Sequence, residues 1–186
     1  MAQPRTTAAK RARGMPETDV LDLTWDFFGE LCRVLAVKVA NAGYRPDVVI
    51  GIAKAGVIPG AVVASILRCD FHSLKISRDS GGERVRARPR IFSAAPVEAA
   101  RKRILIVDEI CTSGETLRIA QNAMRQVGPA EIKTATSLVK HGGYKPDFYA
   151  LETEATVIFP WDRQILNDAG EVVTNPLYAD LKGLGS

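Results

Sequence analysis

The sequence predicts an α/β fold, a parallel twisted sheet with helices on both faces. Short apolar stretches typical of buried strands alternate along the chain with segments whose apolar residues fall at helical spacing. Small polar loops follow three of these strands, at residues 54–56, 108–114 and 140–143. Because ligands of such sheets bind beyond the carboxyl ends of the strands, these three loops are the first candidates for a functional site.

The first half of the chain provides two predicted helices and two predicted strands. The first helix begins after Thr24, a good N-cap residue, and stops at Gly43. Its apolar positions at helical spacing are Phe28, Leu31, Cys32, Leu35 and Val39. The run 48–53 is predicted as a buried strand, followed by the loop at 54–56 and a helix from about residue 59 to 67. Residues 71–77 form the next predicted strand.

The second half opens with an irregular segment at 78–102, for which no period predicts a helix or a strand. A loop this long inside a compact domain usually has a function. The clearest strand of the chain follows at 104–107. A helix is then predicted from about 115 to 127, and further strands at 132–139 and 156–159.

Length and composition indicate one globular domain. The chain has 186 residues, of which 46% are hydrophobic and 25% charged, and no apolar run approaches the roughly 20 residues of a membrane span. The beginning of the sequence also lacks the apolar core of a secretory signal. Three cysteines, an odd number without metal-ligand spacing, favour a reducing cytoplasmic location over a disulfide framework.

The positive charge lies almost entirely in the first residues. The net charge is +4, and residues 1–16 contain four basic residues and no acid, so residues 17–186 balance to zero. We therefore expect a disordered basic tail over 1–16 and a single domain over 17–186. The balanced charge of that domain argues against nucleic acid as a partner, and there is no membrane-spanning segment to indicate a membrane.

Two adjacent carboxylates, Asp108 and Glu109, follow the apolar strand at 104–107. Neighbouring residues of a strand point to opposite sides, so the two acids are expected to have separate tasks. Carboxylates can accept hydrogen bonds from the vicinal hydroxyls of a sugar, and they provide the hard oxygen ligands that Mg²⁺ requires. The pair is therefore a candidate for both tasks, with Asp108 and Glu109 as candidate metal ligands.

A hydroxyl-rich loop enters the next helix shortly after these acids, and it consists of Thr112, Ser113, Gly114, Glu115 and Thr116. Hydroxyls and free N–H groups at a helix N-terminus favour a phosphate, and Gly114 allows close approach of the backbone. Glu115 would repel a phosphate and is expected to point outward. Each half alone fits an ordinary strand end followed by a capped helix, but their combination favours a function. The loop has neither the Gly-Lys-Ser/Thr of a Walker A motif nor the Gly-x-Gly-x-x-Gly of a dinucleotide site.

The stretch 104–116 resembles the phosphoribosyl pyrophosphate (PRPP) signature of type I phosphoribosyltransferases. Over roughly 22–165 the chain is most similar to the xanthine/guanine/hypoxanthine (6-oxopurine) enzymes of that family. The resemblance implies the type I fold with a small hood and a flexible lid, a homo-oligomer (dimer or tetramer), and Mg²⁺-dependent transfer of a phosphoribosyl group to a nucleobase with release of pyrophosphate. It also implies that Asp108 and Glu109 contact the ribose hydroxyls, directly and through Mg²⁺, and that Thr112–Thr116 wrap the 5-phosphate.

A second match is the loop Lys54-Ala55-Gly56, which is similar to the pyrophosphate loop of the 6-oxopurine enzymes, where a cis peptide often occurs. Lys54 can neutralise the pyrophosphate, while Ala55 and Gly56 leave their backbone N–H groups open for contacts. The alternative is a tight turn with a solvated lysine. The segment 78–102 would be the lid of the family, and Lys75 and Arg78 near the end of the preceding strand are our candidates for further pyrophosphate contacts.

The acceptor base is assigned by resemblance to Lys140, Val157 and Phe159. A lysine ammonium favours a keto oxygen over an amino group and so favours hypoxanthine, guanine or xanthine. Two departures leave other acceptors open. Thr112 stands where the purine enzymes carry an aspartate, and a threonine at this position resembles the orotate enzymes instead. The aromatic residue expected near Thr156 is also missing. Two alternatives therefore stay open. The acceptor could be a pyrimidine or another unusual molecule, or the protein could be a PRPP-sensing regulator that binds nucleic acid.

Overall fold

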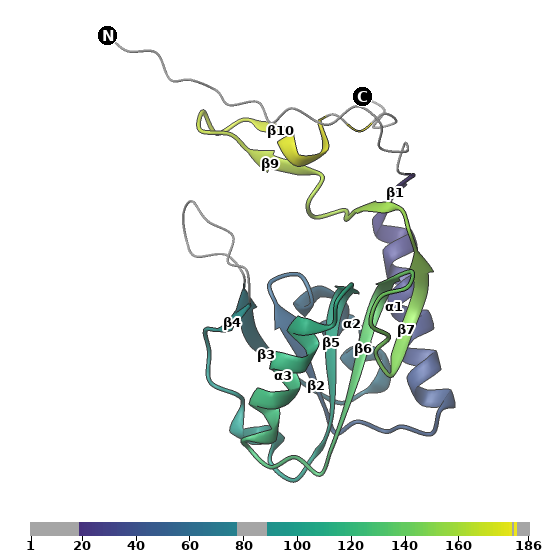
Figure 1. Ribbon diagram of the computed structural model, residues 1–186, viewed down its shortest axis with the longest axis vertical. Helices are drawn as coiled ribbons and strands as arrows, with labels where there is room; N and C mark the ends of the chain where they lie inside the picture. The colour runs from purple at the N-terminus through teal and green to yellow at the C-terminus, as the bar shows by residue number, and fades with distance from the viewer. Residues whose placement is uncertain (1–18, 78–88, 180, 182–186) are drawn as a thin grey trace.

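The computed structural model describes residues 19–77, 89–179 and 181, and its centre is a six-stranded sheet (Figure 1). Across the sheet the strands are β4 (Arg90–Ile91), β3 (Asp70–Ser77), β2 (Val48–Ala53), β5 (Arg103–Cys111), β6 (Glu131–Lys140) and β7 (Phe148–Thr153). All neighbours are parallel except β3 and β4. The carboxyl ends of the four parallel central strands consequently meet at one edge of the sheet.

Helices cover both faces of this sheet, as the sequence predicts (Figure 1). The helices α1 (Trp25–Asn41) and α2 (Val57–Leu67) share one core with Leu105 and Val107 of β5. The helix α3 (Glu115–Arg125) shares the other core with Ile104 and Ile106. Because successive strand residues point to opposite faces, the continuous apolar run of β5 supplies both cores at once.

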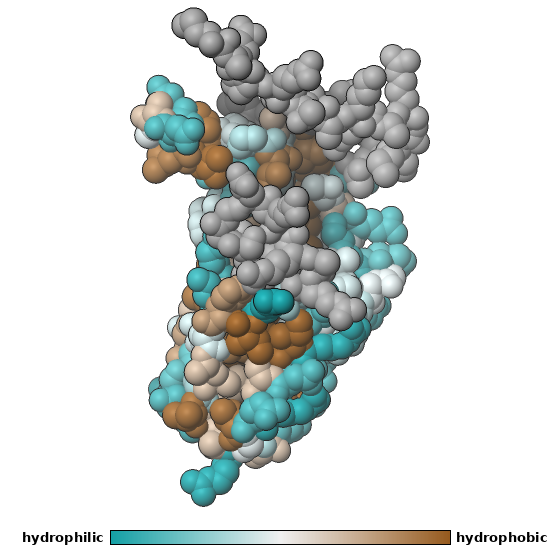
Figure 2. All heavy atoms as spheres, turned by 60° about the vertical axis from the view of Figure 1, so that its left-hand side comes forward, coloured by the Kyte–Doolittle hydropathy of each residue, from teal (hydrophilic) through white to brown (hydrophobic). Residues whose placement is uncertain are grey.

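A hood of short elements lies above the carboxyl end of the sheet in Figure 1. It comprises β1 (Val20–Asp22) paired with β8 (Thr156–Ile158), the hairpin β9 (Gln164–Leu166) and β10 (Val172–Thr174), and the 3₁₀ turn η2 (Pro176–Tyr178). An ion pair of 2.5 Å between Arg163 and Asp22 ties the hairpin to β1. In Figure 2, apolar side chains gather on the hairpin, where Leu166 is 66% exposed.

The observed elements differ from the predicted ones mainly in length. Thr24 caps α1 as expected, accepting the Phe27 N–H at 3.2 Å. The strand predicted at 104–107 continues to Cys111, so the acids lie inside β5 and not in a loop behind it. The reason is the neighbouring strand, because β6 pairs with β5 as far as the partners Cys111 and Val139. The strands β1, β7, β9 and β10 have no clear period in the sequence and were not predicted.

Of the irregular segment at 78–102, the structure describes residues 89–102, and these contain β4 and a 3₁₀ turn. Residues 90 and 91 form β4, and the Phe92 N–H donates to Lys75 O at 2.7 Å. Ala99 is fully buried in the core beneath α3. Within the described part of this segment, residues 90–93 hydrogen-bond to β3, and the flexible lid over 78–102 stays a prediction. Arg78 and the basic tail at 1–16 lie outside the described residues. Among the described helices, none is long and apolar enough to cross a membrane.

Candidate active site

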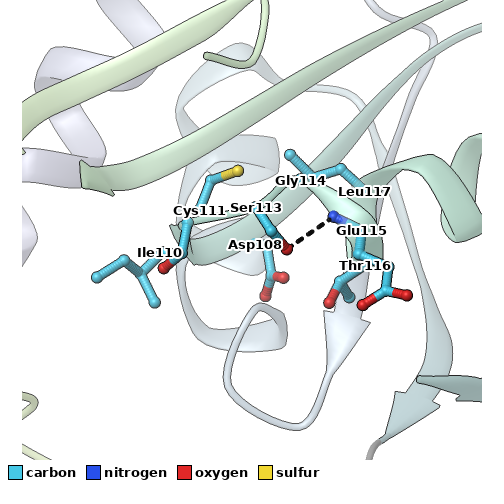
Figure 3. A pocket seen from close by; sticks show the side chains of 9 residues that line it. Asp108, Ile110, Cys111, Ser113, Gly114, Glu115, Thr116 and Leu117 are labelled. Atoms are coloured by element: carbon cyan, nitrogen blue, oxygen red, sulfur yellow. Dashed lines mark hydrogen bonds between the residues drawn. The ribbon is translucent and has the colours of Figure 1, made fainter. Parts of the chain in front are cut away.

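The two acids of β5 line two different cavities. Asp108 lines a cavity of about 460 Å³ together with residues 110–117, and its carboxylate faces the loop before α3 (Figure 3). Glu109 lines a second cavity of about 740 Å³, which extends beneath the hood. The two acids thus face different cavities, although the Glu109 side chain still interacts with Asp108, and their separate tasks stay a prediction.

Asp108 is held in a desolvated position beneath the 54–56 loop. Its side chain is buried, and its Oδ1 accepts the Glu109 N–H at 3.1 Å. A Cβ added to Gly56 would lie 2.7 Å from the same oxygen, so the loop can approach Asp108 only with glycine at this position. Burial, and secondarily the neighbouring Glu109 charge, raise the pKa of Asp108. A cation at this position would offset both effects.

The loop before α3 presents a helix N-terminus to the first cavity. Gly114 adopts the left-handed conformation (φ 73°) and the helix begins at the next residue. Ser113 Oγ accepts the Glu115 N–H at 3.4 Å, the dashed line of Figure 3, while the N-cap residue Gly114 has no side chain that could cap the helix. N–H groups at such a terminus attract an anion. Glu115 is half-buried and lines this cavity, and the expectation that its carboxylate points away from a bound phosphate stays a prediction.

The loop after β6 supports the loop before α3 through Tyr144, a residue that the sequence analysis did not single out. The Tyr144 N–H donates to Thr112 O at 2.8 Å, and Arg118 donates to Ser113 O at 3.0 Å. The Arg118 guanidinium also lies 5.1 Å from the centre of the Tyr144 ring. A Cβ added to Gly114 would overlap the Tyr144 ring, which is a steric clash. Tyr144 and Arg118 thus fix the backbone that faces the cavity.

Residues predicted for pyrophosphate and base meet in the second cavity. Its lining joins Lys54 and Ala55 on one side to Lys140, Val157 and Phe159 on the other. The peptide bond between Ala53 and Lys54 is cis, as the resemblance implied. The loop and hood residues thus come together across the carboxyl end of the sheet, although more than 80 positions separate Lys54 from Lys140 in the sequence.

The Lys140 ammonium is engaged by the backbone between β7 and β8. It donates to Ala155 O and, at 3.5 Å, to Glu154 O. Burial lowers the pKa of Lys140. An ammonium has three donors, so one stays available for a keto oxygen in the cavity after these two contacts.

Aromatic rings form one wall of the second cavity. Phe159 and Trp161 both line it and stack on each other with centroids 4.7 Å apart. Trp161 in turn meets Phe28 of α1 edge-on at 4.8 Å. Trp161 therefore packs against the core, and it also reaches the cavity. These rings supply the aromatic surface that the sequence lacks near Thr156.

Two polar residues of the hood, Asp162 and Tyr178, also line the second cavity. Neither was predicted as a site residue. Asp162 ends the segment 156–162, which resembles the base pocket of the 6-oxopurine enzymes, but no role was assigned to its side chain, and Tyr178 lies in a segment without any motif. Only the fold brings them to the site.

Comparison with known proteins decides the family. The family profile of the phosphoribosyl transferase domain matches residues 24–166. The chain belongs to the phosphoribosyltransferase family.

Several members of the family resemble this phosphoribosyltransferase. A xanthine-guanine phosphoribosyltransferase of Gluconobacter oxydans is 25% identical over 75% of this chain and 83% of its own. A transcriptional regulator, GfcR of Methanococcoides burtonii, is 26% identical over 72% and 70% of the two chains. An orotate phosphoribosyltransferase of Phenylobacterium zucineum is 33% identical over 61% and 54%. The crystal structure of a purine phosphoribosyltransferase from Pyrococcus horikoshii superposes with a TM-score of 0.66 at 30% identity, covering 77% and 93%.

Proposed function

We propose that this phosphoribosyltransferase moves the 5-phosphoribosyl group of PRPP to a nucleobase with release of pyrophosphate, and that a 6-oxopurine is the acceptor. The observation that carries the proposal is the end of β5. There Asp108 faces the helix-terminal loop of one cavity, and Glu109 faces the lysine- and aromatic-lined second cavity. A phosphorylated sugar at this strand end would place its phosphate in the first cavity and its anomeric carbon toward the second.

Mg²⁺ fits these residues as a substrate-bound ion. Within the described residues no cluster of three acidic, histidine or cysteine side chains could hold a metal alone. Mg²⁺ characteristically binds through one or two carboxylates together with substrate phosphates and water. Asp108 and Glu109 would hold it, and the desolvated Asp108 carboxylate gains from a nearby cation. When bound, the ion supplies positive charge that stabilises the pyrophosphate leaving group.

The protein's own groups then act by position and charge. Lys54 would neutralise the departing pyrophosphate, and the carboxylates would hold the ribose hydroxyls while positive charge develops at the anomeric carbon. The N-terminus of α3 would anchor the 5-phosphate, fixing the sugar for attack by the base nitrogen. Thr112 cannot serve as a general base near neutral pH. The proton of the attacking nitrogen would therefore pass to water.

The acceptor is proposed from the chemistry of the second cavity. The Lys140 ammonium can donate to a keto oxygen, and the stacked rings of Phe159 and Trp161 offer an apolar wall to a planar base. Both features suit a 6-oxopurine. Orotate would add a carboxylate, for which the described lining offers the cations Lys54 and Lys140.

The test is incubation with PRPP, Mg²⁺ and a panel of guanine, hypoxanthine, xanthine, adenine, orotate and uracil, with pyrophosphate release as the readout. We expect release with a 6-oxopurine, little with adenine, and none without a base. Transfer to orotate alone would overturn the acceptor class, and binding of PRPP without transfer to any base would overturn the enzymatic proposal. Homo-oligomer formation and a cytoplasmic location stay predictions.

A second candidate is a regulator that senses PRPP and binds nucleic acid, favoured by the similarity to GfcR. Its basic residues would be those of 1–16, because the rest of the chain is neutral. Titration with DNA and RNA at rising salt distinguishes the two functions. A regulator would bind with a steep salt dependence that changes with PRPP, whereas the proposed enzyme would bind weakly and independently of PRPP.

A further inference from the structure

The chain beyond the family match returns to the acceptor cavity. The phosphoribosyl transferase domain profile ends at residue 166, yet β9 and β10 form a hairpin that reverses the chain. This reversal brings Tyr178 of η2 to the lining of the second cavity, together with Lys140 and Val157. The hood segment 167–178 therefore adds to the cavity a side chain that lies outside the residues matched by the family profile.

Tyr178 is held in place by a closed set of hydrogen bonds. Its hydroxyl donates to Asp162 Oδ2 at 2.5 Å, while the buried Asn175 amide donates to Asp162 O at 2.8 Å and to Oδ1 at 3.2 Å. The Asn175 N–H donates to Arg163 O at 2.9 Å, and its Oδ1 accepts the Leu177 N–H at 3.1 Å. Asp162 thus lies between the hairpin and η2, and it fixes the position of the phenol ring.

This geometry makes the phenol oxygen an acceptor toward the cavity. The single hydroxyl proton is committed to Asp162, so only lone pairs remain for a ligand. Burial, assisted by Asp162, raises the pKa of Tyr178, and the phenol keeps its proton at neutral pH. Lys140 supplies a donor to the same cavity. The pair complements a heterocycle that carries a keto oxygen together with a ring N–H or an amino group.

Resting on the proposed transfer reaction, we propose that Tyr178 contacts the acceptor base and selects bases with a hydrogen-bond donor, and that Asp162 is a positioning residue acting through Tyr178. The alternative is a structural role, in which the Tyr178–Asp162 bond merely secures the hood. The two differ in what a variant loses. A contact with the base affects ligands that contain a base, whereas a loosened hood affects stability and every ligand of the site.

The experiment measures binding by calorimetry on the full chain, so that it does not depend on turnover. The ligands are GMP and IMP, which contain a base, and ribose 5-phosphate, which does not. The principal variant is Tyr178→Phe, and its matched control is Tyr149→Phe on β7, whose ring packs beside Lys38 and Lys145 outside the cavity lining. Thermal unfolding of each variant accompanies the titrations.

We expect Tyr178→Phe to weaken GMP binding about tenfold, the loss typical of one hydrogen bond, and ribose 5-phosphate binding less than about twofold. Equal losses for GMP and IMP would indicate a contact with a ring N–H, and a loss for GMP alone a contact with the amino group. Asp162→Ala should reproduce the loss. Asp162→Asn keeps an oxygen that accepts the phenol proton and should restore most of the GMP affinity.

Unchanged GMP affinity in Tyr178→Phe would overturn the inference, as would equal losses for GMP and ribose 5-phosphate. Neither result would contradict the proposed function, because transfer by the unaltered chain is measured separately with the panel of bases. Failure of the proposed function would give a different result, in which the unaltered chain binds ribose 5-phosphate but neither GMP nor IMP. That result would also contradict the proposed contact between Tyr178 and the base.

Discussion

The two cavities at the carboxyl end of the sheet are built in different ways. The first is made almost entirely by one continuous stretch, Asp108 to Leu117, in which a strand, a left-handed glycine and a helix N-terminus follow one another. The second takes residues from the 54–56 loop, β5, β6, β8 and η2. A site built by contiguous residues can be inferred from the sequence itself, whereas residues of the fold-assembled cavity, such as Lys140 and Phe159, were assigned only by resemblance to a family. The difference also suggests that the first cavity binds what the family shares and the second what distinguishes its members.

The largest expected effect comes from the strand end that both cavities share. Replacing Asp108 by Asn and Glu109 by Gln together should lower transfer activity by about three orders of magnitude or more, because charge stabilisation at the reacting sugar is lost from both sides. The fold should survive, since the changes are close to isosteric. Pyrophosphate release and circular dichroism of the double variant check this. Full activity of the double variant would show that the two acids of β5 are not part of the active site.

A smaller effect, confined to the second cavity, is expected from Lys140→Met. The change removes the donor to the base and the contacts with Glu154 O and Ala155 O. The KM for the base should rise about tenfold to a hundredfold, while the KM for PRPP changes little. Steady-state kinetics with each substrate varied in turn provides the measurement. A parallel rise in both KM values would show that the two cavities do not act separately.

The first cavity should respond to Gly114→Ala. A Cβ at this position meets the Tyr144 ring, and a left-handed backbone costs alanine about 1 kcal/mol by itself. The KM for PRPP should rise severalfold, with a lower unfolding temperature. Gly128→Ala is the matched control, because Gly128 has a similar φ of 67° with nothing within 4 Å of an added Cβ. If both variants bind PRPP equally, the close packing of the loop before α3 against Tyr144 is not needed for binding.

The same contrast explains how far the sequence predicts the molecule. The fold class and the central strands follow from apolar runs such as 48–53, because burial on both faces leaves a continuous pattern. The acids of β5 and the glycine before α3 lie close together in the sequence, so a local motif was enough to predict them as site residues. By contrast, β7 and the hood are short and half-exposed, so their pairing is decided by partners distant in the sequence. Tyr178 reaches the site only through the Asp162 and Asn175 bonds, which no local pattern encodes.

The smallest effect should come from the opposite end of the sheet, where Asp47 pairs with Arg103. The Asp47 carboxylate accepts the Arg103 backbone N–H at 2.8 Å and also meets its guanidinium at 2.8 Å. These hydrogen bonds lower the pKa of Asp47 to about 2. A folded-state pKa below the unfolded one adds stability above the unfolded pKa, and this stability is lost as pH falls through the folded value. Both side chains are substantially exposed, so solvent screens the pair and the gain is modest.

Asp47→Asn should therefore lower the unfolding temperature slightly at pH 7 and much less near pH 2, where about half of the native carboxylate is already protonated. Urea unfolding of both proteins between pH 2 and 7 measures the difference. The affinities for PRPP and for the base should stay unchanged at neutral pH, because this ion pair lies at the end of β5 away from both cavities. A change in either affinity would mean that the whole sheet, rather than its carboxyl edge alone, determines the geometry of the site.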